Sequence, residues 1–187
     1  MSGSAASPSR TFEDLYPEAA PALYAWVALR IRAPLRTRLD PEDVLQEVCF
    51  RAWRAFGDFD PAIAPFRAWI FGIAHHVLQE AFRTLARDPR AGATHSAVSA
   101  ALREAPARST TVSRRVARDE AIQQFLARVE RFDESDRKLL MLRGLEGLSH
   151  AEVADALELS PQAAAKRWQR LRDSLAEDTV AVSLLAS

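Results

Sequence analysis

The chain reads LSHAEVADALELSPQAAAKRWQRLRDSL over residues 148–175, with its acids mostly in the first half and its bases mostly in the second. Ser149 and Glu152 have the spacing of a capping box, which starts a helix. Ser160 followed by Pro161 indicates a second helix start, because serine caps a helix and proline fits its first turn. The stretch therefore predicts a short helix, a tight turn and a longer basic helix.

The basic helix has two contrasting faces. Ala164, Trp168, Leu171 and Leu175 recur at spacings of four, three and four, which predicts a buried stripe. A solvated basic face would explain such a helix in isolation, but the caps, the turn and the short preceding helix favour a DNA-binding helix-turn-helix. Amide and lysine side chains would reach base edges, and arginines would hold phosphates. The expected DNA contacts are Gln162, Ala165, Lys166, Arg167, Gln169, Arg170 and Arg172.

The composition limits the class of protein. The chain has 187 residues, 48% of them apolar, which suits one medium domain or two small ones. Its formal net charge is zero, so a DNA-binding surface must come from local sorting of charge. Cys49 is the only cysteine, which excludes an internal disulfide. Because neither a secretory signal nor a run of about eighteen apolar residues occurs, we expect a cytoplasmic protein without membrane insertion.

Apolar residues recur at helical spacings throughout, which predicts an all-α protein of two small helical domains. The first domain spans residues 10–87. It contains a helix or helix pair over residues 11–32, interrupted near Pro17 and Pro21, then helices over 41–56, capped by Asp40, and 66–87. A flexible linker is expected over residues 88–117, with a transient helix near 96–103. The second domain, with the helix-turn-helix, spans residues 118–178.

The helix that starts at Pro41 predicts a protein-binding face. By helical angle, one set of side chains clusters opposite the apolar positions Val44, Val48 and Ala52. Acids and an aromatic ring on one face suit a partner with basic residues, and a solvated face is the alternative. The members of this face are Asp43, Gln46, Glu47, Phe50 and Arg54.

Two motifs resemble a known family. Ser-x-x-Glu-Val-Ala-x-x-Leu-x-Leu-Ser followed by Lys-Arg-x-x-Arg-x-Arg is similar to region 4 of the extracytoplasmic-function group of sigma-70 factors. Asp-Pro-Glu-Asp-Val-Leu-Gln-Glu-Val is similar to region 2 of the same group. The resemblance implies that region 4 reads the minus thirty-five promoter element, and that Asp43, Gln46 and Glu47 bind the clamp helices of the polymerase beta-prime subunit.

The segment FDPAIAPFRAWIFGIAHHVLQEAFR, residues 59–83, resembles the loop and helix beside the minus ten element in this family. In the family that loop captures a flipped base, so Phe59, Ile63 and Arg67 are expected around such a pocket. Along the helix His75, His76 and Arg83 are further candidates, where the two histidines replace the usual Arg-Asn pair. Glu158 stands in the turn where many members have glycine, and a left-handed backbone there would cost about 1 kcal/mol.

The resemblance implies a sigma factor that binds core RNA polymerase and promoter DNA, with an anti-sigma factor as a further partner. We expect no enzyme activity and no cofactor or metal, because no catalytic set, metal cluster or phosphate loop is recognisable. One alternative is a stand-alone helix-turn-helix regulator, since response regulators carry a similar motif. Another is an adaptor that binds polymerase without touching DNA.

Overall fold

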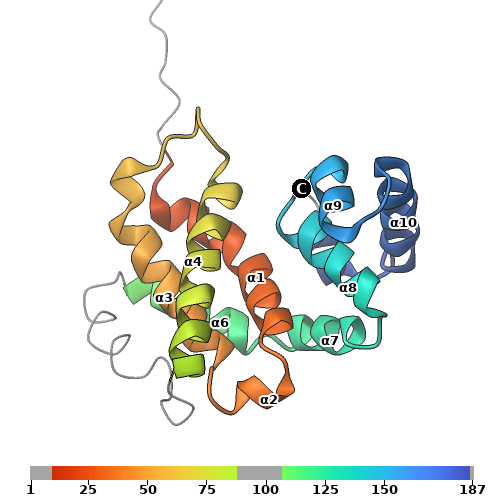
Figure 1. Ribbon diagram of the computed structural model, residues 1–187. Helices are drawn as coiled ribbons and strands as arrows, with labels where there is room; N and C mark the ends of the chain where they lie inside the picture. Colours follow the sequence, from red (N-terminus) through yellow and green to blue (C-terminus); the bar gives the residue numbers. More distant parts are fainter. Residues whose placement is uncertain (1–9, 88–106, 186–187) are drawn as a thin grey trace, which may run out of the picture.

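The computed structural model describes residues 10–87 and 107–185, and every regular element in these ranges is helical, as expected. The N-terminal domain, on the left of Figure 1, is built from residues 10–87 and 107–117, and the C-terminal domain, on the right, from residues 118–185. In the first lie α1 (Phe12–Arg30), α2 (Ala33–Arg36), α3 (Pro41–Arg54), η1 (Phe56–Asp58), α4 (Phe66–Arg87) and α6 (Ala107–Ala117). In the second lie α7 (Glu120–Val129), α8 (Glu134–Leu139), η2 (Leu140–Leu145), α9 (His150–Leu157), α10 (Pro161–Ser174) and α11 (Thr179–Leu185).

Helix α1 is the central helix of the N-terminal domain. It starts at a capping box in which Thr11 N donates to the Asp14 carboxylate at 3.0 Å. It then continues through Pro17 and Pro21, so the predicted interruption is wrong. Each proline removes one helical hydrogen bond. The helix tolerates this loss because its buried face, which includes the fully buried Trp26, packs against α3, α4 and α6.

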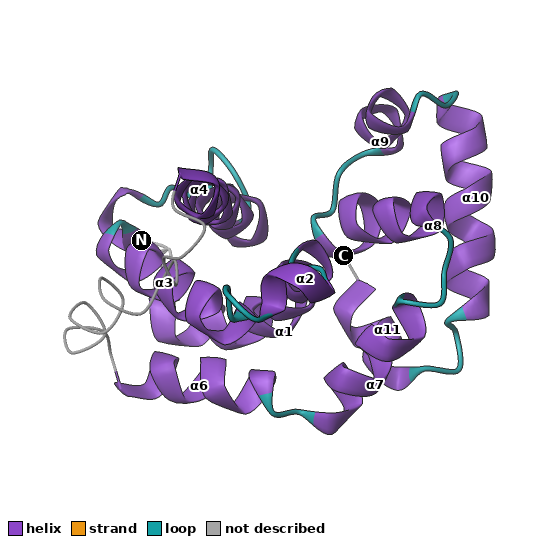
Figure 2. Cartoon of the chain, turned by 60° about the horizontal axis from the view of Figure 1, so that its bottom comes forward, coloured by secondary structure: helices purple, strands orange, loops and turns teal. Residues whose placement is uncertain are grey.

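The other helices of this domain begin and end close to the expected residues. Asp40 caps α3 by accepting from Glu42 N at 2.8 Å, and α4 covers the expected range. The exception is the expected linker, whose last eleven residues form α6. Helix α6 lies alongside α1 and α3 (Figure 2), and the buried Ser113 hydroxyl hydrogen-bonds Tyr16 Oη at 2.7 Å. The helix expected near residues 96–103 lies outside the described residues.

The C-terminal domain contains the predicted helix-turn-helix and one helix that was not predicted. Asp119 and Asp133 cap α7 and α8, and η2, a π-helical turn, continues directly from α8. Helix α11 lies beyond the expected end of the domain at residue 178. It buries Ala181, Leu184 and Leu185 and packs against α7, η2 and α1.

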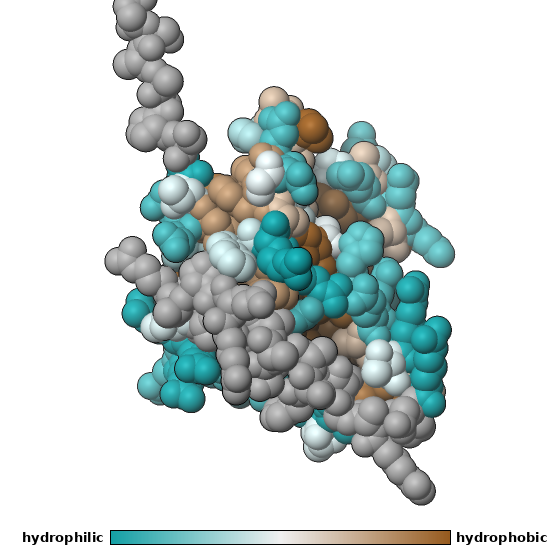
Figure 3. Space-filling view, turned by 90° about the vertical axis from the view of Figure 1, so that its left-hand side faces the viewer, coloured by the Kyte–Doolittle hydropathy of each residue, from teal (hydrophilic) through white to brown (hydrophobic). Residues whose placement is uncertain are grey.

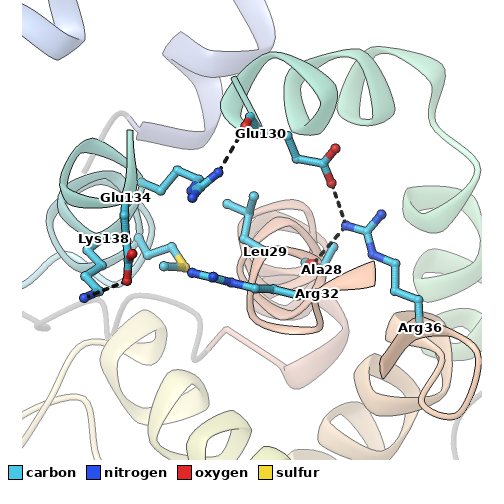
Figure 4. A pocket seen from close by; sticks show the side chains of 9 residues that line it. Ala28, Leu29, Arg32, Arg36, Glu130, Glu134 and Lys138 are labelled. Atoms are coloured by element: carbon cyan, nitrogen blue, oxygen red, sulfur yellow. Dashed lines mark hydrogen bonds and ion pairs between the residues drawn. The ribbon is translucent and has the colours of Figure 1, made fainter. Parts of the chain in front are cut away.

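The two domains contact one another along a seam between α1 and the elements η2, α7 and α11. A cavity of about 290 Å³ opens at this seam, lined by side chains of both domains (Figure 4). Arg36 crosses it to pair with Glu130 at 3.1 Å, while Lys138 pairs with Glu134 at 3.0 Å. The seam thus combines charged side chains with buried apolar side chains that form one continuous cluster through both domains.

Candidate nucleic-acid interface

Helix α10 presents the predicted basic face. Ser149 and Glu152 form the expected capping box of α9, and Ser160 Oγ accepts from Ala163 N at 3.1 Å at the start of α10. The predicted stripe Ala164, Trp168, Leu171 and Leu175 is buried. Ala165 is half-buried. Five predicted DNA contacts are exposed on the opposite side of the helix, namely Gln162, Lys166, Gln169, Arg170 and Arg172.

Arg167 differs from these residues because its side chain is bound by acids of its own domain. Its Nη2 lies 2.9 Å from both carboxylate oxygens of Asp133, and its Nε donates to Asp136. The hydrogen bond to Asp136 is the largest cause of the raised pKa of Arg167. The backbone amide of Asp136, followed by the charge of Arg167, lowers the pKa of Asp133. Arg167 therefore fixes α10 against the start of α8.

The turn between α9 and α10 has the left-handed geometry considered from sequence. Glu158 has φ 55° and ψ 41°, and no other non-glycine residue in the described ranges has a positive φ. Its side chain is exposed. The backbone strain thus lies at the turn that sets the angle between α9 and the DNA-facing helix.

The predicted face of α3 is only partly accessible. Gln46 and Phe50 are 5% and 7% exposed, so the prediction that both belong to an exposed face is wrong. Helix α6 packs against α3, and Arg114 of α6 lies 4.0 Å from Glu42, which in turn accepts from Gln46 at 2.9 Å. The sequence does not indicate this packing, because the composition of the α6 segment is typical of a linker.

The remaining members of that face lie nearer to solvent. Glu47 accepts from Arg51 at 2.6 Å, and Arg51 also pairs with Glu80 of α4 at 2.8 Å. Arg54 is exposed and lies over the ring of Phe50 at 5.7 Å. Asp43 is half-buried. Of the five predicted members of this face, Asp43, Glu47 and Arg54 are thus the ones with solvent access.

The loop before α4 is anchored by an aromatic cluster. Phe59 contacts Phe56, Phe66 and Trp69 at centroid distances of 5.1–5.7 Å. Ile63, in contrast, is 84% exposed. Figure 3 shows a strongly hydrophobic group among hydrophilic ones at the top of the coloured surface. The cluster holds the base of the loop and leaves its tip free to contact a partner.

The basic residues predicted along α4 divide between two faces. Arg67 and His75 lie two turns apart on one face and point at the C-terminal domain. Arg67 donates to the main-chain carbonyl of Leu145, and His75 Nε2 lies 2.9 Å from the Glu146 carboxylate. His76 and Arg83 are exposed on the other side of the helix. Arg67 therefore does not join Phe59 and Ile63 in one pocket in this conformation.

A cluster of polar side chains at the seam is not predicted by the sequence. Glu146, whose side chain is 6% exposed, accepts from Trp26 Nε1 and from Arg30 Nη2, the latter at 2.9 Å. Burial alone would raise the pKa of Glu146, but hydrogen bonds from His75 and Trp26, with the nearby positive charges, lower it overall. No local sequence signal links Glu146 to its three partners, each of which lies more than seventy positions away from it.

Two further properties of the described residues bear on function. They contain no group of His, Cys, Asp or Glu side chains arranged to hold a metal ion. None of their helices combines the length and the apolar character that are needed to cross a bilayer.

Comparison with known proteins places these surfaces in a family. Residues 10–88 match Sigma-70 region 2, and residues 122–175 match Sigma-70 region 4. The RNA polymerase sigma factor CnrH of Cupriavidus metallidurans is 31% identical over 148 residues, covering 73% of this chain and 71% of CnrH. The RNA polymerase sigma factor NccH of Alcaligenes xylosoxydans xylosoxydans is 29% identical over 138 residues, covering 73% and 71%.

A solved structure of CnrH in complex with the cytosolic domain of CnrY is 26% identical and covers 84% of this chain and 79% of that one. Its TM-score is 0.34, too low to support a structural argument. The two family matches and the identity with CnrH are sufficient by themselves. The chain belongs to the sigma-70 family of RNA polymerase sigma factors, in its extracytoplasmic-function group, and it directs the initiation of transcription.

Proposed function

We propose that α10 reads the minus thirty-five element of a promoter. The observation that carries this proposal is the exposed face of α10, on which amide and basic side chains lie opposite the buried stripe. Gln162, Lys166 and Gln169 contact base edges, Arg170 and Arg172 contact phosphates, and Ala165 allows close approach. Arg167 positions the helix through its ion pairs with Asp133 and Asp136.

The N-terminal domain divides its surfaces between polymerase and the minus ten element. Asp43, Glu47 and Arg54 of α3 contact the clamp helices of the beta-prime subunit, while Gln46 and Phe50 support them from within. Ile63 at the loop tip, held by the cluster around Phe59, contacts an unstacked base. His76 and Arg83, which are exposed, contact the DNA backbone, whereas Arg67 and His75, which contact the C-terminal domain, would reach it only if the two domains separated.

The chain acts without chemistry of its own, by recruiting core polymerase to promoters. Because that polymerase works on chromosomal DNA, the cytoplasm is its place of action. CnrH, a relative of this chain, has been solved with the cytosolic domain of CnrY bound to it. A protein regulator that binds this chain in a comparable way, an anti-sigma factor, is part of the proposal.

Transcription in vitro tests the residue roles. Purified chain with core polymerase and a library of genomic fragments is expected to give discrete start sites. Lys166→Ala/Arg170→Ala is expected to reduce specific transcripts at least about tenfold, because each lost contact to DNA costs about 1–3 kcal/mol. Arg118→Ala/Arg131→Ala removes the same charge from exposed positions outside the proposed interface, and is expected to leave transcription unchanged.

Each alternative predicts a different outcome. Tight, sequence-specific DNA binding without polymerase would identify a stand-alone regulator. Full activity of Lys166→Ala/Arg170→Ala would identify an adaptor that does not read DNA. Absence of any specific transcript would overturn the assignment of both promoter-binding surfaces.

A further inference from the structure

The Glu146 carboxylate is held by three donors that all belong to the other domain. Trp26 Nε1 and Arg30 Nη2 come from α1, and His75 Nε2 comes from α4. Glu146 itself follows η2 of the C-terminal domain, and its side chain is 6% exposed. Burying a carboxylate so completely is costly unless its charge is paired and its oxygens are hydrogen-bonded, as they are here.

The donor set is assembled within the N-terminal domain and does not need Glu146 to hold it together. The Arg30 guanidinium lies 4.4 Å from the Trp26 ring centroid, and the His75 ring packs edge-on against Trp26 at 4.7 Å. Trp26 in turn packs edge-on against Phe71 of α4 at 5.6 Å. These contacts fix all three donors on α1 and α4, so the cluster remains built when the domains separate.

The cluster has more hydrogen-bond donors than the Glu146 carboxylate uses. Arg30 Nε is buried and has no hydrogen-bond partner among the described residues, although it is adjacent to the Nη2 that binds Glu146. Glu146 contributes two acceptor oxygens, and three donors already share them. A phosphodiester carries the same single negative charge on two non-bridging oxygens, and it accepts the forked donors of arginine well.

We propose that Trp26, Arg30 and His75 form a binding site for a backbone phosphate of promoter DNA, and that Glu146 occupies this site in the closed molecule. The proposal rests on the proposed function, because it extends the DNA-facing surface of α4 onto α1. One anion excludes the other, so binding of DNA at this site and closure of the seam compete. A ligand that binds only the open state shifts the population toward it.

Arg67 supports closure from the same face of α4. It donates to the carbonyls of Gly144, Leu145 and Leu184, which lie at the C-terminal ends of η2 and α11. Such carbonyls lack partners within their own helix and carry the negative end of the helix dipole. In the closed molecule the cations of this face therefore bind the C-terminal domain instead of nucleic acid.

Two measurements on the full chain distinguish two roles of the cluster. Its residues either only hold the two domains together, or they also bind phosphate when Glu146 leaves. Opening is measured as loss of energy transfer between fluorophores on the two domains. DNA binding is measured by anisotropy with a labelled duplex of arbitrary sequence, because a phosphate contact is independent of sequence. Glu146→Gln is expected to open the chain and to bind the duplex about tenfold more tightly, while Glu177→Gln, which removes the same charge from an exposed position of the same domain, is expected to change neither.

The decisive comparison is with Arg30. Arg30→Ala and Glu146→Gln/Arg30→Ala are expected to open the chain without the gain in DNA affinity. The salt dependence of the double variant is expected to be shallower than that of Glu146→Gln, by about one unit of slope. If the alanine variant unfolds, Arg30→Lys replaces it. This variant keeps the positive charge but lacks the forked donors of the guanidinium group.

Each remaining outcome overturns the proposal. If Arg30→Ala gains as much affinity for the duplex as Glu146→Gln, the cluster only holds the domains together and does not bind phosphate. If Glu146→Gln neither opens the chain nor changes binding, the closed state does not control access to DNA. Wild-type transcription with core polymerase is scored separately, so failure of the proposed promoter contacts is distinguishable from failure of this inference.

Discussion

Arg67 of α4 binds the main-chain carbonyl of Leu145 with two nitrogens, Nε at 2.9 Å and Nη2 at 2.6 Å. Burial lowers the pKa of the guanidinium, but arginine remains charged at any physiological pH. Because Arg67 stays charged and its acceptors are neutral carbonyls, this contact stabilises the seam independently of pH. The neighbouring contact of Glu146, in contrast, depends on the ionisation of its carboxylate.

Removing Arg67 is expected to uncouple the two domains. Hydrogen bonds from a charged donor are worth about 1.5–3 kcal/mol, so Arg67→Ala should weaken docking by about 2 kcal/mol. Calorimetry is then expected to resolve two unfolding transitions where the wild type shows one. Arg83→Ala, at an exposed position of the same helix, serves as the control and should leave the trace unchanged. A single transition at the wild-type temperature in Arg67→Ala would contradict the coupling.

Acidification is expected to open the seam through Glu146. Its pKa lies below the ordinary 4.5, so the carboxylate favours the closed form above that pH and loses this effect as pH falls through the lowered value. Energy transfer between the domains should therefore decrease on titration below about pH 4.5. Glu146→Gln should lack this step. Equal titration curves for the two proteins would assign the opening to other carboxylates.

Replacing Glu158 by glycine is expected to stabilise the C-terminal domain. The left-handed backbone costs a residue with a Cβ about 1 kcal/mol more than glycine, and the exposed side chain leaves no cavity when removed. Ala156→Gly, at an exposed site inside α9, should instead destabilise by about 1 kcal/mol. Urea unfolding of both variants measures the difference. Destabilisation by both would show that the side chain of Glu158 has a favourable role in the fold.

Substitutions of Arg167 and Lys166 are expected to have different effects, the first on stability and the second on DNA binding. Arg167→Ala removes the ion pairs to Asp133 and Asp136, and should lower stability by about 1 kcal/mol or less, since the pairs are partly exposed and screened. Lys166→Ala should leave unfolding unchanged and weaken DNA binding. The roles would be reversed if Lys166→Ala destabilised the domain and Arg167→Ala weakened only the DNA complex.

Gly144 tests how closely α11 packs. A Cβ at this position would clash with Leu185 Cδ2 and approach Trp168 Cη2 at 2.9 Å. Gly144→Ala is therefore expected to destabilise the domain by about 1–3 kcal/mol, the usual range for overpacking. Leu185→Ala removes the nearer obstacle, so the double variant should lose less than the sum of the two single losses. Strict additivity would show that α11 does not meet Gly144.

Local signals were sufficient to predict most helices and the DNA-facing helix. Asp40, Ser149 and Ser160 cap through their own neighbouring amides, and the stripe that includes Trp168 follows from helical spacing alone. Such features are encoded within a few residues, so a single sequence reveals them. The exposed face of α10 was predictable for the same reason.

Features that depend on distant contacts were not predictable. Helix α6 has only Val112 and Val116 as large apolar residues, and it is fixed by distant contacts such as the Tyr16–Ser113 hydrogen bond, across 97 positions. The two prolines of α1 are tolerated because of tertiary burial, which propensity does not include. At Glu146 the seam joins three segments through single side chains, and the periodicity of apolar residues does not predict such a contact.

The packing of α6 also determines how the two domains can move. Only Arg118 and Asp119 separate α6 from α7. Asp119 caps α7, and the amides of both residues bond back to α6. While α6 stays on the N-terminal domain, this short connection limits how far the C-terminal domain can move away from it. We therefore expect the connection to restrict the distance between α10 and the minus ten surfaces, and with it the promoter spacings that the protein can span.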